Sequence, residues 1–214
     1  MPRDRRTAPL PPTIRAPRFE RRRLVSLAIV LFASGTIVCE RSRHARPQGD
    51  DHARYHDRTF RVARVIDGDT LDIDIADGDK YVTRIRLLGV DAPETGHGRD
   101  GEMYFGTRAS EFAEERLRGR TVHVVLPRER TRGKFGRLLA YVHLERGGPM
   151  FNETLIEEGL AYADLRFQHH YYRQFKAIET RARREGRGLW ADVTIEKMPA
   201  WRRRFEKRTT ATSE

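Results

Sequence analysis

Charged residues stand beside turn residues at four places in the chain. They are the Asp-Gly-Asp turn at residues 67–69, Arg86 within a hydrophobic run, Asp-Ala-Pro-Glu at residues 91–94, and Gly-Lys-Phe-Gly-Arg at residues 133–137. An arginine that faces the interior or rim of a barrel is costly unless it is paired. We therefore expect Arg86 to bind an anion, either Glu94 or a ligand.

Residues 65–75 place four aspartates within eight positions, and a carboxylate that points into a cleft needs a cation. An EF-hand loop requires acidic groups at its positions 1, 3 and 5, glycine at 6 and glutamate at 12. No aspartate in this stretch starts that pattern. A cation site would therefore be assembled from separate strands, which favours a cleft with an open coordination position.

Short alternating runs from Phe60 onward indicate half-buried strands. Leu71 and Ile73 share one face, so Asp72 and Asp74 are expected on the opposite, solvated face. The expected strands cover residues 60–66, 70–75, 81–90, 121–126 and 136–144, with a tight turn at Asp77 and Gly78.

Apolar residues at helical spacing predict helices over residues 102–120, 152–161 and 171–185, the second with Asn152 as its N-cap. A helix inserted between the third and fourth of five short strands is typical of a small closed sheet. The sequence therefore predicts an α+β fold, mainly β: a five-stranded OB-fold barrel with three helices. This fold hosts many functions and decides none of them.

The N-terminal part resembles an export signal or a membrane anchor. Residues 1–23 are basic and expected to be disordered, and residues 24–39 are apolar and uncharged. As a helix, the apolar segment would extend about 24 Å, which suits a signal peptide or a short anchor. A cleavable signal would end at Gly35, and Arg21 and Arg22 loosely resemble a twin-arginine signal.

Positive charge is denser before the apolar segment than after it, so the folded part is expected outside the cytoplasm, either exported or membrane-anchored. Residues 40–58 have few large aliphatic side chains and are expected to form a linker. The domain is expected over residues 59–194, and the basic tail at 195–214 is expected to fray.

The net charge of +11 suggests an anionic partner. Residues 1–59 hold much of the excess, with 13 Lys/Arg against 6 Asp/Glu, so basicity alone does not show that the folded part binds nucleic acid. Cys39 is the single cysteine, which excludes an intrachain disulfide and a thiolate zinc site.

Six motifs between residues 60 and 190 resemble the thermonuclease family, whose prototype is staphylococcal nuclease. They occur in the family's order and at matching separations. The resemblance implies an OB-fold barrel and a calcium-dependent phosphodiesterase activity on DNA and RNA. The motifs are VIDGDTLDI, RIRLLGVDAPET, FGTRASEF, GKFGRLLAYV, FNETLIEEGLA and REGRGLW.

The resemblance also implies a role for each matching residue. Asp69 and Asp91 match the calcium carboxylates, with Asp67 beside them, and Ala92 stands where the family supplies a backbone carbonyl. Glu94 matches the general base. The two phosphate-binding arginines correspond to Arg86 and Arg137.

Lys134 and Phe135 match positions near the substrate phosphate. Phe135 replaces the more common tyrosine, and Gly133 replaces a usual aspartate. A phosphodiester attacked by water gains negative charge on its equatorial oxygens, and fixed positive groups aimed at those oxygens lower the barrier. Each of the two arginines can donate two parallel hydrogen bonds to phosphate, which lysine cannot do.

Two non-catalytic functions compete with the nuclease. One is an OB-fold module that binds single-stranded nucleic acid through aromatic and basic residues while tethered to the membrane. The other is an anchored scaffold for protein contacts. A degenerate binder would have no reason to keep Glu94, Arg86 and Arg137. Tyr162 and Phe167 could stack on a base or pack in the core. The chain is expected to be a monomer.

Overall fold

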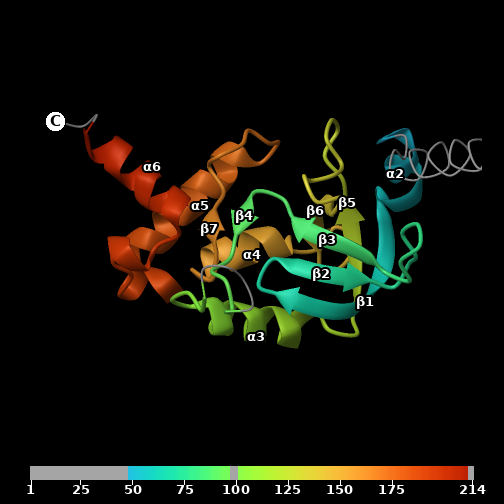
Figure 1. Cartoon of the computed structure of the whole chain (residues 1–214), viewed down its shortest axis with the longest axis horizontal. Helices are drawn as coiled ribbons and strands as arrows, with labels where there is room; N and C mark the ends of the chain where they lie inside the picture. The colour runs from blue at the N-terminus through green and yellow to red at the C-terminus, as the bar shows by residue number, and fades with distance from the viewer. Residues whose placement is uncertain (1–47, 97–100, 212–214) are drawn as a thin grey trace, which may run out of the picture. The chain divides into compact units, whose positions relative to one another are not determined.

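The computed structural model describes residues 48–96 and 101–211 (Figure 1). The expected basic region, the apolar signal or anchor segment and the first part of the expected linker lie outside these residues. Within the described ranges, no helix combines the length and the apolar character needed to cross a membrane.

Five strands form a closed barrel in the order β1-β2-β3-β6-β5. Neighbouring strands pair antiparallel except β3 and β6, which are parallel. This order places the fifth barrel strand between the third and the fourth, as expected for an OB fold, and confirms the predicted fold class. The strands are β1 (Arg58–Asp67), β2 (Thr70–Ile73), β3 (Thr83–Leu87), β5 (Thr121–Val125) and β6 (Leu138–His143).

A separate two-stranded sheet pairs β4 (Val90–Asp91) with β7 (Tyr162–Ala163). In Figure 1 this small sheet lies between the barrel and the helices near the C-terminus. It joins the chain segment that leaves β3 to the segment that leads toward α5 (Tyr172–Arg184).

The three expected helices are present as α3 (Gly106–Leu117), α4 (Phe151–Glu157) and α5. Their apolar faces are buried as predicted; in α3, Ala109, Ala113 and Leu117 reach the core. The prediction that Asn152 caps α4 is wrong, because Met150 holds the N-cap position. Asn152 is buried, where its Oδ1 accepts from the Val142 N–H at 2.9 Å.

Helix α2 (Gln48–Tyr55) lies within the expected linker, so the linker expectation is wrong for this part. The segment has few large apolar residues, but it still contributes one of them to the core. Tyr55 is completely buried in the core, and its hydroxyl lies 3.1 Å from the hydroxyl of Thr83. Asp51 is also buried, where it pairs with Arg132.

Helix α6 (Ala200–Ala211) lies within the C-terminal tail that was expected to fray. Arg202 of α6 is buried, and its guanidinium donates to both carboxylate oxygens of Glu179 on α5, at 2.9 and 2.8 Å. The tail was expected to fray because it has few apolar side chains. A buried ion pair fixes it together with the apolar contacts of Met198 and Trp201. The short helices η1 (Gly188–Ala191) and η2 (Ile195–Lys197) precede it.

One further expectation fails on the β2 strand. Asp72 was expected on a solvated face, but it is 1% exposed. Arg64 and Arg84 both donate to it, at 2.7 and 2.8 Å, and cover it from the neighbouring strands β1 and β3. Asp74, beyond the end of the strand, is exposed as expected. The expected turn at Gly78 is confirmed by its φ of 66°.

Candidate active site

The turn between β1 and β2 presents Asp69. The Asp69 N–H donates to Asp67 Oδ1 at 3.0 Å, which is the local bond that favours aspartate at turns. Gly68 is required here because a Cβ would lie 2.7 Å from the Cβ of Ala92 and 2.9 Å from that of Ala109. The turn therefore packs directly against the chain that carries Asp91.

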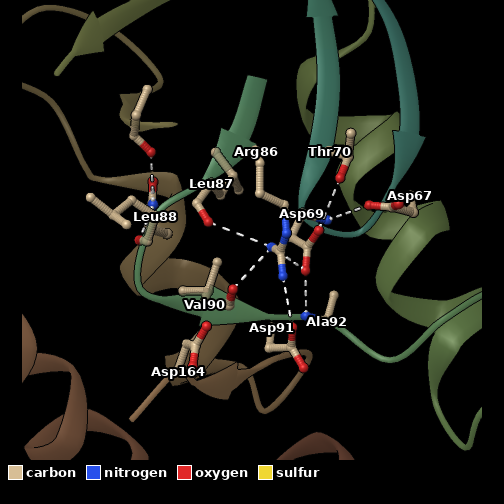
Figure 2. A network of polar contacts seen from close by, with 12 residues as sticks. Asp67, Asp69, Thr70, Arg86, Leu87, Leu88, Val90, Asp91, Ala92 and Asp164 are labelled. Carbon is tan, nitrogen blue, oxygen red and sulfur yellow. Dashed lines mark hydrogen bonds and ion pairs between the residues drawn. The ribbon is translucent and has the colours of Figure 1, made fainter. Parts of the chain in front are cut away.

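Arg86 joins the two predicted metal carboxylates. On β3 it lies opposite Thr70, next to Asp69. Its Nη1 forms a close ion pair with Asp69 Oδ2, and its Nη2 donates to Asp91 Oδ1 at 2.7 Å. Nη1 also donates to the carbonyl oxygen of Val90 at 2.9 Å. Figure 2 shows this guanidinium between the two carboxylates. Among the described residues Arg86 therefore pairs with these two aspartates and not with Glu94, which was one of its two expected partners.

Asp69 is 5% exposed, and burial raises its pKa well above the ordinary value. The Arg86 charge opposes this shift, whereas Asp67 and Asp91 add to it. The Ala92 N–H donates to Asp69 Oδ2 at 2.6 Å and stabilises the ionised form. A buried carboxylate surrounded by other carboxylates favours a bound cation.

Asp91 receives two further donors that the sequence did not predict. Arg166 Nη2 donates to Oδ1 at 3.0 Å. Trp201 Nε1 donates to Oδ2 at 2.7 Å, and the Arg166 guanidinium lies 4.5 Å from the Trp201 ring. The sequence held one signal for Trp201: it stands four residues before Phe205, a helical spacing within a basic segment. Nothing in the sequence pointed to Arg166.

Glu94 follows β4 at the start of the loop toward α3. Gly106, the first residue of α3, lets the helix approach this loop, since a Cβ there would lie 2.2 Å from the Glu94 carbonyl oxygen. The Glu94 carboxyl is exposed, and it makes no ion pair within residues 48–96 and 101–208. Partial burial raises its pKa, with Asp67 and Asp91 adding to the shift and the two site arginines opposing it.

Arg137 precedes β6 and lies within electrostatic range of Arg86, Asp69 and Glu94. Burial and the positive charge of Arg86 lower its pKa, and the carboxylates partly offset this. Its guanidinium forms no ion pair with any described residue. Arg137 is thus a half-buried cation beside the cluster, with its hydrogen-bond donors open to a ligand.

The loop that carries Arg137 also presents Lys134 and Phe135. Both are exposed, and the Phe135 ring, 74% exposed, lies 6.0 Å from the Arg137 guanidinium. Arg132 fixes the base of this loop. It pairs with Asp51 and Asp77 at 2.6 Å each, which ties the loop to α2 and to the β2–β3 turn.

Four of the eight predicted site residues are joined directly by ion pairs and hydrogen bonds: Arg86, Asp69, Asp91 and Ala92. Glu94 and Arg137 lie within electrostatic range of this group. Lys134 and Phe135 lie on the adjoining exposed loop. Phe167 is also exposed, whereas Tyr162 is buried in the core and cannot stack on a base.

The donor set fits a hard divalent cation. Asp69 and Asp91 offer carboxylate oxygens that meet at one guanidinium, and calcium prefers oxygen ligands in a loose shell. The family resemblance implies a backbone carbonyl ligand at Ala92, but the hydrogen bond that the structure shows for this residue is made by its N–H. Within the described part of the chain, no group of three His, Cys, Asp or Glu side chains could enclose a metal alone. Waters and a phosphate would have to complete the shell.

Comparison with known proteins identifies the family. Residues 84–192, about half of the chain, match the model of the staphylococcal nuclease homologue family. The chain belongs to the staphylococcal nuclease family. The thermonuclease of Staphylococcus hyicus is 34% identical over 138 residues, which cover 64% of this chain and 78% of that protein. The thermonuclease of Staphylococcus intermedius is 38% identical over 133 residues, 62% of this chain and 76% of that protein.

A third relative, endonuclease YncB of Bacillus subtilis, is 31% identical over 147 residues, 67% of each chain. As a member of this family, the protein is a hydrolytic nuclease, as predicted. The non-catalytic binding module and the scaffold lose their support. The matched residues end at 192, so helix α6 and Trp201 of this nuclease lie beyond the family model.

Proposed function

We propose that this nuclease hydrolyses phosphodiester bonds of both DNA and RNA, with low sequence specificity and in a calcium-dependent reaction. The observation that carries the proposal is the convergence of Asp69 and Asp91 on the Arg86 guanidinium. Glu94 and Arg137 lie within electrostatic range of that cluster. These relationships support a site in which a base and two phosphate donors act beside a bound cation.

Asp69 and Asp91 would hold the calcium ion. When bound there, calcium supplies positive charge beside the scissile phosphate and offsets the negative charge that develops during attack. The pairing of both carboxylates with Arg86 shows that this place already accommodates a positive group. Ionised Asp69, which burial disfavours, would be stabilised by the same charge.

Arg86 and Arg137 would bind the phosphate oxygens. A guanidinium donates two parallel hydrogen bonds to phosphate, and donors fixed before the reaction need no reorganisation during it. Arg137 has its donors open in this structure, whereas Arg86 would exchange part of its carboxylate contacts for phosphate contacts. Arg86 lies on β3, and Arg137 lies in the loop before β6.

Glu94 would take the proton from the attacking water, directly or through a second water. Its raised pKa makes the ionised carboxylate a stronger proton acceptor. The carboxyl is exposed, which leaves it accessible to water.

Low specificity follows from the kinds of groups that face the substrate. Lys134 and both arginines address phosphate, which carries no sequence information. The exposed rings of Phe135 and Phe167 can stack on any base. Among the described residues near the cluster, we identify no group that would select one particular base. We also identify no donor that would distinguish ribose from deoxyribose.

The purified chain tests this proposal with denatured DNA and with RNA as substrates. Both should be degraded in calcium, degradation should stop with EGTA, and calcium in excess of the chelator should restore it. Asp69→Asn is the matched variant, which should fold but respond only to much higher calcium. Undiminished cleavage in EGTA would remove calcium from the reaction.

We also propose export or membrane anchoring of this nuclease through residues 24–39, with the folded domain outside the cytoplasm and active as a monomer. The support is the basic-then-apolar pattern of the sequence. Cell fractionation combined with N-terminal sequencing of the mature protein separates the alternatives. Cleavage after Gly35 indicates a signal peptide, an intact N-terminus in the membrane fraction indicates an anchor, and an intact soluble cytoplasmic chain contradicts both.

A further inference from the structure

Helix α6 contacts the proposed calcium site through one side chain. Trp201 Nε1 donates to Asp91 Oδ2 at 2.7 Å, across 110 positions of sequence. Helix α6 lies outside residues 84–192, which match the family model. The family match therefore does not reach this contact.

The helix is held rigidly to the strand that carries Asp91. Arg202, next to Trp201, is buried and pairs with both oxygens of Glu179. The same Glu179 accepts from the Ala163 N–H on β7 at 2.9 Å, and Ala163 pairs with Val90 on β4. One chain of buried polar contacts thus runs from α6 through α5 to the small sheet.

The two oxygens of Asp91 have separate partners. Oδ1 shares the Arg86 guanidinium with Asp69 and also receives Arg166. Oδ2 receives Trp201. The indole N–H therefore holds one oxygen and leaves the other directed to the place where Asp69 and Asp91 meet.

We propose that Trp201 is a positioning residue that orients Asp91 for calcium binding. This inference rests on the calcium site of the proposed function and goes beyond it. Groups that hydrogen-bond to metal ligands fix their orientation, and losing one typically costs about 10–100-fold in metal affinity. Trp201→Phe should therefore weaken calcium binding by about 10–100-fold. The rate at saturating calcium should fall less than the affinity does.

The chain offers a matched control. Trp190 is the second of its two tryptophans and packs against Tyr162, as Trp201 does. Trp190 Nε1 is buried and has no hydrogen-bond partner among the described residues. Trp190→Phe therefore removes the same ring atoms from the same region but no hydrogen bond to Asp91.

Calcium binding to the full chain, measured by titration calorimetry, decides the question alongside the unfolding temperature of each protein. We expect Trp201→Phe to bind calcium about 10–100-fold more weakly and Trp190→Phe to bind like the natural chain. Equal calcium affinity in both variants would overturn the role of Trp201. An absence of calcium binding by the natural chain would overturn the proposed calcium site, and this inference with it.

A second measurement leaves Trp201 in place, in case Trp201→Phe does not fold. In Trp190→Phe, Trp201 is the sole tryptophan, so its emission reports on the indole beside Asp91. Calcium should change this emission with the affinity found by calorimetry. Emission that is unchanged when calorimetry shows the site to be filled would contradict the coupling.

Discussion

Arg86 Nη2 donates to Asp91 Oδ1 at 2.7 Å, although Asp91 lies beyond the end of the strand that carries Arg86. The same guanidinium also pairs with Asp69. One residue thus holds the two carboxylates together and, in the proposed reaction, would also bind the substrate phosphate. This double role makes Arg86 the most informative position of the site.

Arg86→Lys keeps the charge but not the two-branched donor. We expect the rate at saturating calcium to fall by about 100–1,000-fold, the usual cost of one transition-state donor. Single-turnover cleavage of a labelled oligonucleotide measures it. Arg137→Lys is the comparison, because Arg137 has no ion pair among the described residues. It should lose rate similarly but leave the unfolding midpoint unchanged. A rate for Arg86→Lys close to that of the natural chain would contradict the assignment.

Glu94→Gln removes the proposed base and keeps the size of the side chain. Hydrolysis should fall by about 100-fold or more, while the affinity for a single-stranded oligonucleotide in calcium stays near its natural value. Rapid-quench kinetics and fluorescence anisotropy measure the two quantities. Equal losses in binding and in rate would point to a binding role for Glu94 instead.

The pH dependence of the reaction tests the environment of Glu94. The base works when ionised, so activity is lost as the pH falls through its pKa. Partial burial, with Asp67 and Asp91, raises that pKa, and the acidic limb should lie at a higher pH than an exposed glutamate would give. Asp67→Asn keeps the Oδ1 acceptor of the turn but removes one charge, so it should move the limb to lower pH. If the acidic limb of the pH–rate profile does not move in Asp67→Asn, the limb does not report the pKa of Glu94.

The sequence predicted the barrel because it depends on local patterns, and the resemblance to the thermonuclease family supplied the site residues. Alternating runs defined the strands, and the turn at Asp67 and Asp69 and the Asp91-to-Glu94 loop were recognisable as motifs. Trp201 and Arg166 were missed because their contacts with Asp91 depend on how distant segments pack. Motifs reveal spacing along the chain but not which helix reaches a given carboxylate.

Asp72 shows the same limit on the barrel. Alternation placed it correctly opposite Leu71 and Ile73, but that face is covered by two arginines from neighbouring strands. Helices α2 and α6 were missed for a related reason: each has few apolar side chains and is fixed in part by a buried ion pair, of Asp51 and of Arg202. Hydrophobic periodicity does not detect such contacts.

Asp72→Asn should lower the free energy of unfolding by about 1–3 kcal/mol, because it removes the buried charge that both arginines contact. Asp74→Asn is the control, since Asp74 is exposed and two residues away, and it should change stability little. Urea unfolding measures both variants. Activity per folded molecule should be unchanged in each, because the side-chain partners of Asp72 are Arg64 and Arg84, neither of which is a predicted site residue. Equal stability of the two variants would show that the arginines contribute nothing through Asp72.

The most direct test of the calcium site is a crystal structure of the Glu94→Gln variant with calcium and a short single-stranded oligonucleotide. The ion should lie about 2.3–2.6 Å from an oxygen of Asp69 and from one of Asp91, with Arg86 and Arg137 on the phosphate that it contacts. An ion bound elsewhere, or a phosphate that neither arginine reaches, would contradict the central claim.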